Sequence, residues 1–515
     1  MDIFRANGSY NYESLGAIYY ILYCLHKGYR IFFSYDNHSN VSDVSIVSQD
    51  GQHLKDIILT DFPISNLKPT FIGWSDKHIE QLLLLISNLN VGEEYSSIIE
   101  NLSQLSLDDM GRKSWDAELP TGIVELVAKI SSALSCETIY NPYSKNGSLA
   151  IQLHSSSYIG EELYLLNATI ARIRLDACHI SPEIITLGNP MTHVFPKRCD
   201  SVISIPPFML KQMGSSIELR GTTHKTHTVE DYLLWRYLEN EEYRKGIFVF
   251  PAGIGFSLRY SEIRETLTKT GCIDTIISLP AGIFHGTGIY TLLLVLNKDK
   301  KHDLVKFIDG TKFFVKDKKK NILDVDALFS QYLTPSSNLV YWSNGEEMAY
   351  KDFSFSPSMY ADYHNEIPEG YNEFDFDKVF RIPQMSPCTT SEEGYVLYPA
   401  DFSHDYLQIM EGHKDKGTSP NNSYRKSLEP ANLAISFLND TMKIVHLEAD
   451  APVFANSNQI PLVVKEDSPI EMEYAIFSLL HNVQFNSLAK QYNGIGMPLR
   501  RARGVSYTQI RAHER

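Results

Sequence analysis

A regular alternation of helix and strand patterns between residues 121 and 298 most constrains how this chain can fold. Helical patterns, with apolar residues three and four positions apart, occur at 121–134, 148–154, 163–177, 231–243 and 260–271. Strand patterns occur at 137–142, 157–162, 200–205, 246–251, 272–280 and 291–298, and the last is expected to close the series. This alternation predicts an α/β fold, a parallel doubly wound sheet with helices on both faces.

The sequence on either side of this region has a different character. Residues 1–113 are predicted to form a mainly helical domain, and 114–340 the doubly wound domain. Residues 341–374 are polar and irregular, which predicts a linker. Residues 375–515 combine short alternating segments with one helical pattern at 471–492, which predicts a separate α+β domain.

Composition excludes several classes of protein. A chain of 515 residues is too long for one core, and its apolar runs are too short to span a membrane. We expect a cytoplasmic protein with no membrane partner, because the N-terminus has no signal-peptide pattern. The net charge of −15 opposes binding to a polyanion, although a local basic surface can override it. Without CxxC pairs, the six cysteines predict neither a zinc site nor a disulfide framework.

Five short motifs follow one another through the doubly wound region in a characteristic order. They are ETIYNPYSKNGSLA, YIGEELYLLNATIARIRLDACHI, TLGNP, CDSVISIPPF and DTIISLPAGIFHGTGIYTLLLVLNK. In order and spacing, residues 115–300 resemble the modification subunits of type I restriction-modification systems. These are N6-adenine DNA methyltransferases with a Rossmann-like fold. The resemblance implies S-adenosylmethionine as cofactor and double-stranded DNA as substrate.

The terminal domain resembles one target-recognition domain from the specificity subunits of the same systems. The resemblance rests on ANLAISF, on Asn456 and Asn458, and on YNGIGMPLRRARGVSYTQI. Backbone and guanidinium groups around its Gly-rich turn could meet DNA phosphates. A solvated tail is the alternative for this basic cluster. The residues concerned are Lys490, Arg500, Arg501 and Arg503.

The loop that matches the family's catalytic motif has lost its first residue. In the family, an Asn or Asp at this position accepts the amino hydrogens of a flipped adenine, and the aromatic residue stacks on the base. Here Pro206, Pro207 and Phe208 are kept, but Ile205 replaces the acceptor. An alkyl side chain accepts no hydrogen bond. The loop is therefore predicted to be catalytically degenerate, with simple strand termination as the alternative.

The loop that matches the cofactor motif is altered in the same direction. The resemblance places Asn141, Pro142 and Gly147 at the cofactor, with Asn141 replacing an aspartate. Lys145 replaces a glycine, and its charge would repel a sulfonium ligand unless it points to solvent. S-adenosylmethionine binding is therefore predicted to be weak or absent.

Two further positions complete the cofactor motifs. Asn189 stands where the family has an acidic residue facing the adenine ring. Glu162 is retained and matches the carboxylate that accepts the ribose hydroxyls. Its neighbour Glu161 is expected to be solvated.

Three functions are compatible with these residues. The first is a DNA-binding pseudo-methyltransferase of a restriction-modification or defence system. The second is an active adenine-specific DNA methyltransferase with a fused specificity domain. The third is an assembly scaffold of a defence complex, which the acidic net charge favours. All three imply other subunits as partners, and a homo-oligomer is left open.

Overall fold

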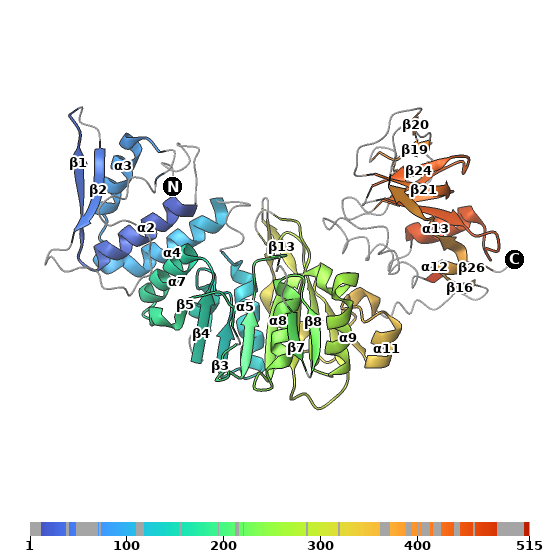
Figure 1. The fold of residues 1–515 in the computed structure, drawn as a ribbon, viewed down its shortest axis with the longest axis horizontal. Helices are drawn as coiled ribbons and strands as arrows, with labels where there is room; N and C mark the ends of the chain where they lie inside the picture. Colours follow the sequence, from blue (N-terminus) through green and yellow to red (C-terminus); the bar gives the residue numbers. More distant parts are fainter. Residues whose placement is uncertain are drawn as a thin grey trace.

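The computed structural model contains three parts that follow the order of the sequence, an N-terminal, a central and a C-terminal part (Figure 1). The described residues are 12–37, 41–47, 71, 74–109, 118–153, 157–193, 195–211, 216–219, 221–284, 287–317, 320–360, 371–387, 394–398, 402, 413–415, 424–436, 443–456, 459–481 and 509–513.

A nine-stranded sheet forms the centre of the molecule. Its strand order is β15-β12-β10-β11-β9-β6-β3-β4-β5. The strands are β3 (Thr138–Asn141), β4 (Ser157–Glu162), β5 (Ile185–Leu187), β6 (Ser201–Ser204), β9 (Lys245–Pro251), β10 (Ile273–Leu279), β11 (Thr291–Asn297), β12 (Val305–Asp309) and β15 (Val340–Ser343).

Most neighbouring strands in this sheet are parallel. The run β5-β4-β3-β6-β9 is parallel throughout, and β10 pairs in parallel with β12. Strand β11 runs in the opposite direction and lies between β9 and β10, and edge strand β15 is also antiparallel. The predicted α/β fold is confirmed, and the sheet is mostly parallel.

Helices cover both faces of the sheet, because successive side chains of each buried strand point to opposite faces. Val202 packs in the apolar cluster on one face and Ile203 in the cluster on the other. The first face holds α8 (Val229–Glu239), α9 (Ser261–Lys269) and α11 (Gly345–Tyr350). The second holds α5 (Thr121–Ala133), α6 (Ser148–Gln152), α7 (Leu165–Ala177) and α10 (Val325–Leu333).

The central part extends further along the chain than the sequence predicts. Strand β11 does not close the series, because β12, α10 and β15 follow it. Residues 341–360 do not form the predicted linker. They include most of β15, which pairs with β12, and α11, whose Met348 is fully buried. At four residues, β15 is too short for its strand pattern to stand out from a linker.

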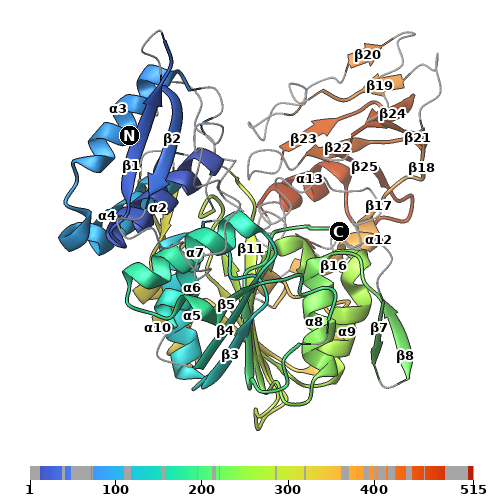
Figure 2. The same ribbon diagram turned by 60° about the vertical axis from the view of Figure 1, so that its left-hand side comes forward.

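The N-terminal part packs its helices against the central part. It consists of α2 (Tyr12–His26), β1 (Arg30–Tyr35), β2 (Val41–Val47), α3 (Asp76–Ser87) and α4 (Val91–Asp109). Its apolar cluster includes Ile170, Ile173 and Ala177 of α7, so α7 joins the two parts. A turned view shows α2 and α4 next to α7 (Figure 2).

The described residues of the C-terminal part form mostly antiparallel strands, with one parallel pair, and two helices. One sheet has the order β17-β25-β22-β23, and a second has the order β18-β21-β24-β19-β20. A separate pair is β16 with β26. The elements are β16 (Tyr371–Asp375), α12 (Phe376–Val379), β17 (Phe380–Arg381), β18 (Met385–Pro387), β19 (Gly394–Val396), β20 (His413–Asp415), β21 (Arg425–Pro430), β22 (Leu433–Ser436), β23 (Lys443–His446), β24 (Pro452–Ala455), β25 (Gln459–Val464), α13 (Met472–His481) and β26 (Gln509–His513).

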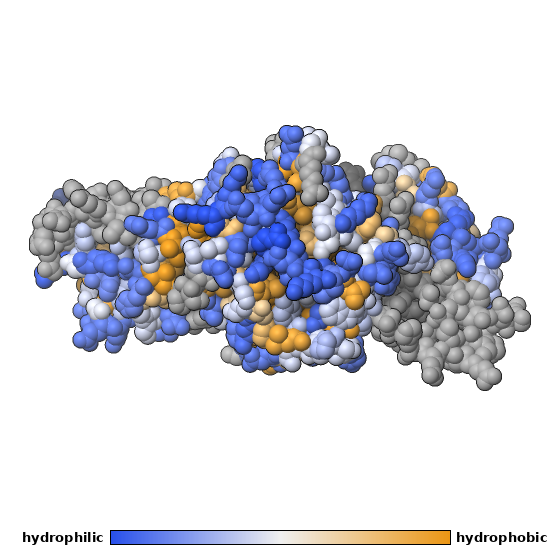
Figure 3. Space-filling model, turned by 90° about the horizontal axis from the view of Figure 1, so that it is seen from below, coloured by the Kyte–Doolittle hydropathy of each residue, from blue (hydrophilic) through white to orange (hydrophobic). Residues whose placement is uncertain are grey.

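Two hairpins project from the central part, β7 (Ser216–Leu219) with β8 (Thr222–Lys225), and β13 (Phe314–Asp317) with β14 (Lys320–Leu323). Short 3-10 turns lie at Pro182–Ile184, Ala252–Gly255, Leu258–Tyr260 and Pro357–Met359. Seen from below, the central part is mostly hydrophilic with small apolar patches (Figure 3). Among the described helices, none combines the length and apolar character needed to cross a membrane.

Candidate functional site

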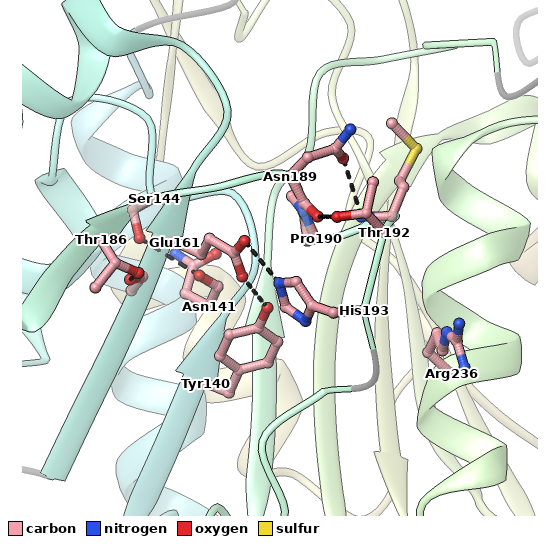
Figure 4. Close-up of polar contacts among 12 residues, drawn as sticks. Tyr140, Asn141, Ser144, Glu161, Thr186, Asn189, Pro190, Thr192, His193 and Arg236 are labelled. Carbon is pink, nitrogen blue, oxygen red and sulfur yellow. Dashed lines mark hydrogen bonds and ion pairs between the residues drawn. The ribbon is translucent and has the colours of Figure 1, made fainter.

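The residues singled out from the sequence gather along one edge of the central sheet. Asn141 ends β3 and Glu162 ends β4, while Asn189 follows β5 and Ile205 follows β6. These four strands are parallel neighbours, so their carboxyl ends meet at the same edge, where ligands bind in open α/β sheets. Figure 4 shows Asn141 and Asn189 on either side of Glu161.

The Pro-Pro-Phe loop after β6 is part of the apolar core. Ile205 is 1% exposed and belongs to the same cluster as Phe208, Ile283 and Phe284. The rings of Phe208 and Phe284 pack edge to face with their centroids 5.0 Å apart. Position 205 is therefore an apolar contact and presents no polar atom to the edge.

A buried carboxyl group holds the end of this loop. Met209 has a φ of +58°, and its backbone N–H donates to Glu230 Oε1 at 2.6 Å. Glu230 is 1% exposed, and its Oε2 has no hydrogen-bond partner among the described residues. Burial raises the pKa of Glu230 above its usual range. No sequence motif singles out Glu230, because its contact with Met209 joins residues 21 positions apart.

Both ends of the Asn141 side chain bond to the chain itself. Its Nδ2 donates to Tyr158 Oη at 2.8 Å, and its Oδ1 accepts from Tyr143 N at 3.1 Å. Asn141 is 1% exposed, and Pro142 after it is also buried. The amide thus fixes the start of the loop that resembles the cofactor motif.

Lys145 in that loop and Glu162 at the end of β4 are buried together. Lys145 N donates to Glu162 Oε2 at 2.6 Å, while Glu162 Oε1 accepts from Tyr164 N at 2.9 Å and from Asn167 Nδ2 at 3.2 Å. Each of the two residues is 2% exposed, so the alternative of a solvent-directed Lys145 is wrong. Burial raises the pKa of Glu162, and these hydrogen bonds offset part of that effect.

The loop is packed tightly against its surroundings. Lys145 has a φ of +51°, in the left-handed region where the family has glycine. Gly147 has a φ of +85°, and a Cβ there would lie 3.2 Å from Ala171 of α7. A Cβ on Gly160 of β4 would lie 2.4 Å from Ser144 Oγ. Backbone and side chains leave little freedom for this loop to rearrange.

Glu161 is buried and bonded, so the expectation that it is solvated is wrong. It is 6% exposed, its Oε2 accepts from Tyr140 Oη at 2.7 Å, and its Oε1 lies 2.8 Å from His193 Nε2. A Cβ on Gly188 would lie 2.3 Å from Oε1, so the carboxylate needs that glycine. These partners come from β3 and from the segment after β5, which the local pattern around Glu161 does not reveal.

Asn189 shapes its own loop. Its Oδ1 accepts from Met191 N at 3.0 Å, and its backbone oxygen accepts from Thr192 N and Thr192 Oγ1. Tyr232 Oη of α8 donates to the backbone oxygen of Pro190 at 3.1 Å, which ties the loop to the helix. An asparagine that bonds its own backbone two residues on is a common turn device.

The basic cluster near the C-terminus lies outside the described residues. Asn458 and the Gly494–Gly496 turn fall outside them as well, while Asn456 N donates to Gln459 Oε1 at 3.0 Å. The predicted DNA contacts there remain predictions. The residues concerned are Lys490, Arg500, Arg501 and Arg503.

Comparison with known families identifies the central part. The model of the N-6 DNA Methylase family matches residues 90–366, more than half of the chain. The chain belongs to the N-6 DNA methylase family. The chain is similar to the methylase subunit of the type I restriction enzyme MpnII of Mycoplasma pneumoniae, with 25% identity over 309 residues. That match covers 52% of this chain and 57% of the relative, so the chain spans little more than half of the relative's length.

Two further similarities extend the comparison. A putative type II restriction enzyme and methyltransferase of Methanocaldococcus jannaschii is 29% identical over 112 residues, which cover 21% of this chain and 9% of the relative. The crystal structure of a type I restriction-modification methyltransferase subunit from Streptococcus thermophilus superposes with a TM-score of 0.49 at 22% identity. The superposition covers 56% of the present chain and 68% of the Streptococcus thermophilus chain.

The family assignment confirms the coarse prediction from the sequence and leaves its finer points as predictions. Membership of a DNA methylase family agrees with the resemblance to restriction-modification methyltransferases. The comparisons favour an adenine DNA methyltransferase over a member that has lost the reaction. Catalytic impairment, weak cofactor binding and a fused recognition domain remain predictions.

Proposed function

We propose that this N-6 DNA methylase family chain binds double-stranded DNA within a restriction-modification or defence complex, and that its own methyl transfer is impaired. The observation that carries this proposal is the state of Glu162. Its carboxylate already accepts three hydrogen bonds from the chain, and Lys145 is buried beside it. A ligand at this edge would have to compete with all of these groups.

The residues at the edge fit S-adenosylmethionine poorly. A carboxylate offers about four lone-pair sites, so Glu162 has little capacity left for two ribose hydroxyls. Asn141 carries no charge for an ammonium group, and both ends of its amide are in use. The ammonium of Lys145 repels a cationic ligand. The residues at this edge therefore do not support methyl transfer from this cofactor.

The Pro-Pro-Phe loop adds a second obstacle. A flipped adenine needs an acceptor for its amino hydrogens, and Ile205 has none. A buried amino group left unpaired costs about 1–3 kcal/mol before any loss of activation. Phe208 packs on Phe284 and would have to leave that contact in order to stack fully on a base.

An active adenine methyltransferase is the second candidate, and two observations favour it. The family match runs through every motif, and a methylase subunit is 25% identical. In addition, Ser204 Oγ is fully buried, with no hydrogen-bond partner among the described residues. Ser204, or the carbonyl of Pro206, would then supply the missing acceptor.

Calorimetry with S-adenosylmethionine and tritium transfer to duplex DNA separate the two candidates. We expect the natural chain to bind the cofactor more than tenfold more weakly than an intact site, about 1.4 kcal/mol, and to transfer no methyl group. The triple variant Asn141→Asp, Lys145→Gly, Ile205→Asn is the smallest set expected to regain methyl transfer. Robust methylation by the natural chain would refute impairment.

A matched control separates an effect on cofactor binding from the relief of backbone strain at a residue with positive φ. Ser135 has a φ of +54° and lies in the connection between α5 and β3. It therefore precedes β3 and is away from the carboxyl edge. Ser135→Gly therefore relieves the same backbone conformation as Lys145→Gly. A gain in cofactor binding with Lys145→Gly but not with Ser135→Gly would assign the effect to the lysine side chain.

A further inference from the structure

The β13–β14 hairpin carries the densest basic run in the chain. Residues 312–320 read KFFVKDKKK and contain one acidic residue, Asp317. The lysines are Lys312, Lys316, Lys318, Lys319 and Lys320. Because the whole chain has a net charge of −15, this run is a strong local reversal of charge.

The hairpin is held at the carboxyl edge of the sheet through Asn321, which pairs with Lys316 close to the turn. Asn321 N donates to Gly282 O at 3.3 Å, and Asn321 Nδ2 donates to Ala281 O at 2.7 Å. Gly282 and Ala281 follow directly after β10. Leu323, at the end of β14, is 6% exposed and packs in the apolar cluster that also holds Ile205 and Phe208.

The hairpin is thereby linked to the Pro-Pro-Phe loop. Phe284, two residues after the anchoring Gly282, contacts the ring of Phe208. In Figure 1 the hairpin rises from the central part toward the side where the N-terminal and C-terminal parts lie. It is therefore held in a defined place next to the candidate site.

The hairpin and Lys312, two residues before β13, combine exposed lysines with exposed apolar side chains. Lys312 and Lys316 are exposed, and the described residues provide neither with an ion-pair partner. Val315 is 62% exposed, Ile322 46% and Phe314 37%. Packing among the described residues does not cover these apolar side chains.

We propose that the β13–β14 hairpin is a DNA-contacting element, with Lys312 and Lys316 on phosphates and the Val315–Ile322 ridge in a groove. A two-stranded ribbon fits the major groove of B-DNA, and lysines supply the sequence-independent part of the affinity. The negative charge of DNA phosphates complements the positive charge of these lysines, whereas an apolar protein partner would leave the lysines unpaired. The inference rests on the proposed function, in which duplex DNA is a partner.

The test measures binding of the full chain to a 30-base-pair duplex by fluorescence anisotropy at several salt concentrations. Each phosphate contact contributes about 0.9 to the slope of log K against log salt, so Lys312→Gln with Lys316→Gln should lower it by about 1.8. Val315→Ser with Ile322→Ser should weaken binding by about tenfold at every salt concentration with an unchanged slope. All four residues are exposed or have exposed side chains, so the melting temperature should stay the same.

A matched control removes the same charge from the opposite edge of the sheet. Lys269 ends α9 ahead of β10, and Lys301 precedes β12, and both are exposed. Lys269→Gln with Lys301→Gln should leave the slope unchanged. If the natural chain binds DNA and the hairpin variants bind it equally well, the proposal is wrong and a protein partner is the better assignment. If the natural chain binds no DNA, the proposed function itself fails.

Discussion

Replacing Ile205 by asparagine tests whether the loop after β6 has kept room for a catalytic amide. Ile205 is 1% exposed and packs in the cluster that contains Phe208, Ile283 and Phe284. Loss of its buried apolar surface costs about 2–3 kcal/mol. An amide without partners in the same place adds about 1–3 kcal/mol. The free energy of unfolding of the central part should therefore fall by about 3–6 kcal/mol.

Hydrogen exchange in the β6 segment, Ser201–Ser204, measures this loss, because these strand amides lie in the middle of the central sheet. Ile205→Val is the control and should cost about 0.5–1.5 kcal/mol, since it removes one methyl group. A loss below about 1 kcal/mol for Ile205→Asn would refute the reasoning. It would mean that position 205 has space and partners for an amide, and would strengthen the case for an active enzyme.

Two further variants test the packing and the charge of the same edge. Gly160→Ala should destabilise the central part by about 1–3 kcal/mol in thermal unfolding, because its Cβ would lie 2.4 Å from Ser144 Oγ and 2.9 Å from Ile185 Cγ1. Adding Ser144→Ala should recover part of the loss. Burial raises the pKa of Glu230. The protonated carboxyl group therefore stabilises the folded state below the usual glutamate pKa, and this contribution is lost as pH rises through the raised pKa. Glu230→Gln cannot titrate, so urea midpoints at pH 5 and pH 8 should differ less in this variant than in the natural chain.

The sequence predicts the central fold well because the signals are local. Most helices and strands from α5 to β11 have their own periodicity and lie where their patterns predict, whereas β5, β7 and β8 were not predicted. The signal fails for β15, whose four residues pair only with β12 and have mixed burial. An edge strand of this length has too few buried positions to produce a pattern.

The candidate site is predictable in position but not in its contacts. Asn141, Glu162, Asn189 and Ile205 reach one edge because they end or follow adjacent parallel strands. The burial of Glu161 depends on Tyr140, His193 and the missing side chain of Gly188, which are brought together only by the fold. No local pattern carries such information. The lysines of the β13–β14 hairpin, in contrast, were readable as a basic run.

The reversed strand β11 also has a consequence for how the protein is synthesised. It pairs with both β9 and β10, so a nascent chain that ends before Thr291 has two apolar strands with unpaired edges. The contact of Phe208 with Phe284 likewise waits for a residue made 76 positions later. The turn between β10 and β11 must form before β11 can enter the sheet, so the central part closes late on the ribosome. Until then, chaperones or the ribosome itself have to shield β9 and β10.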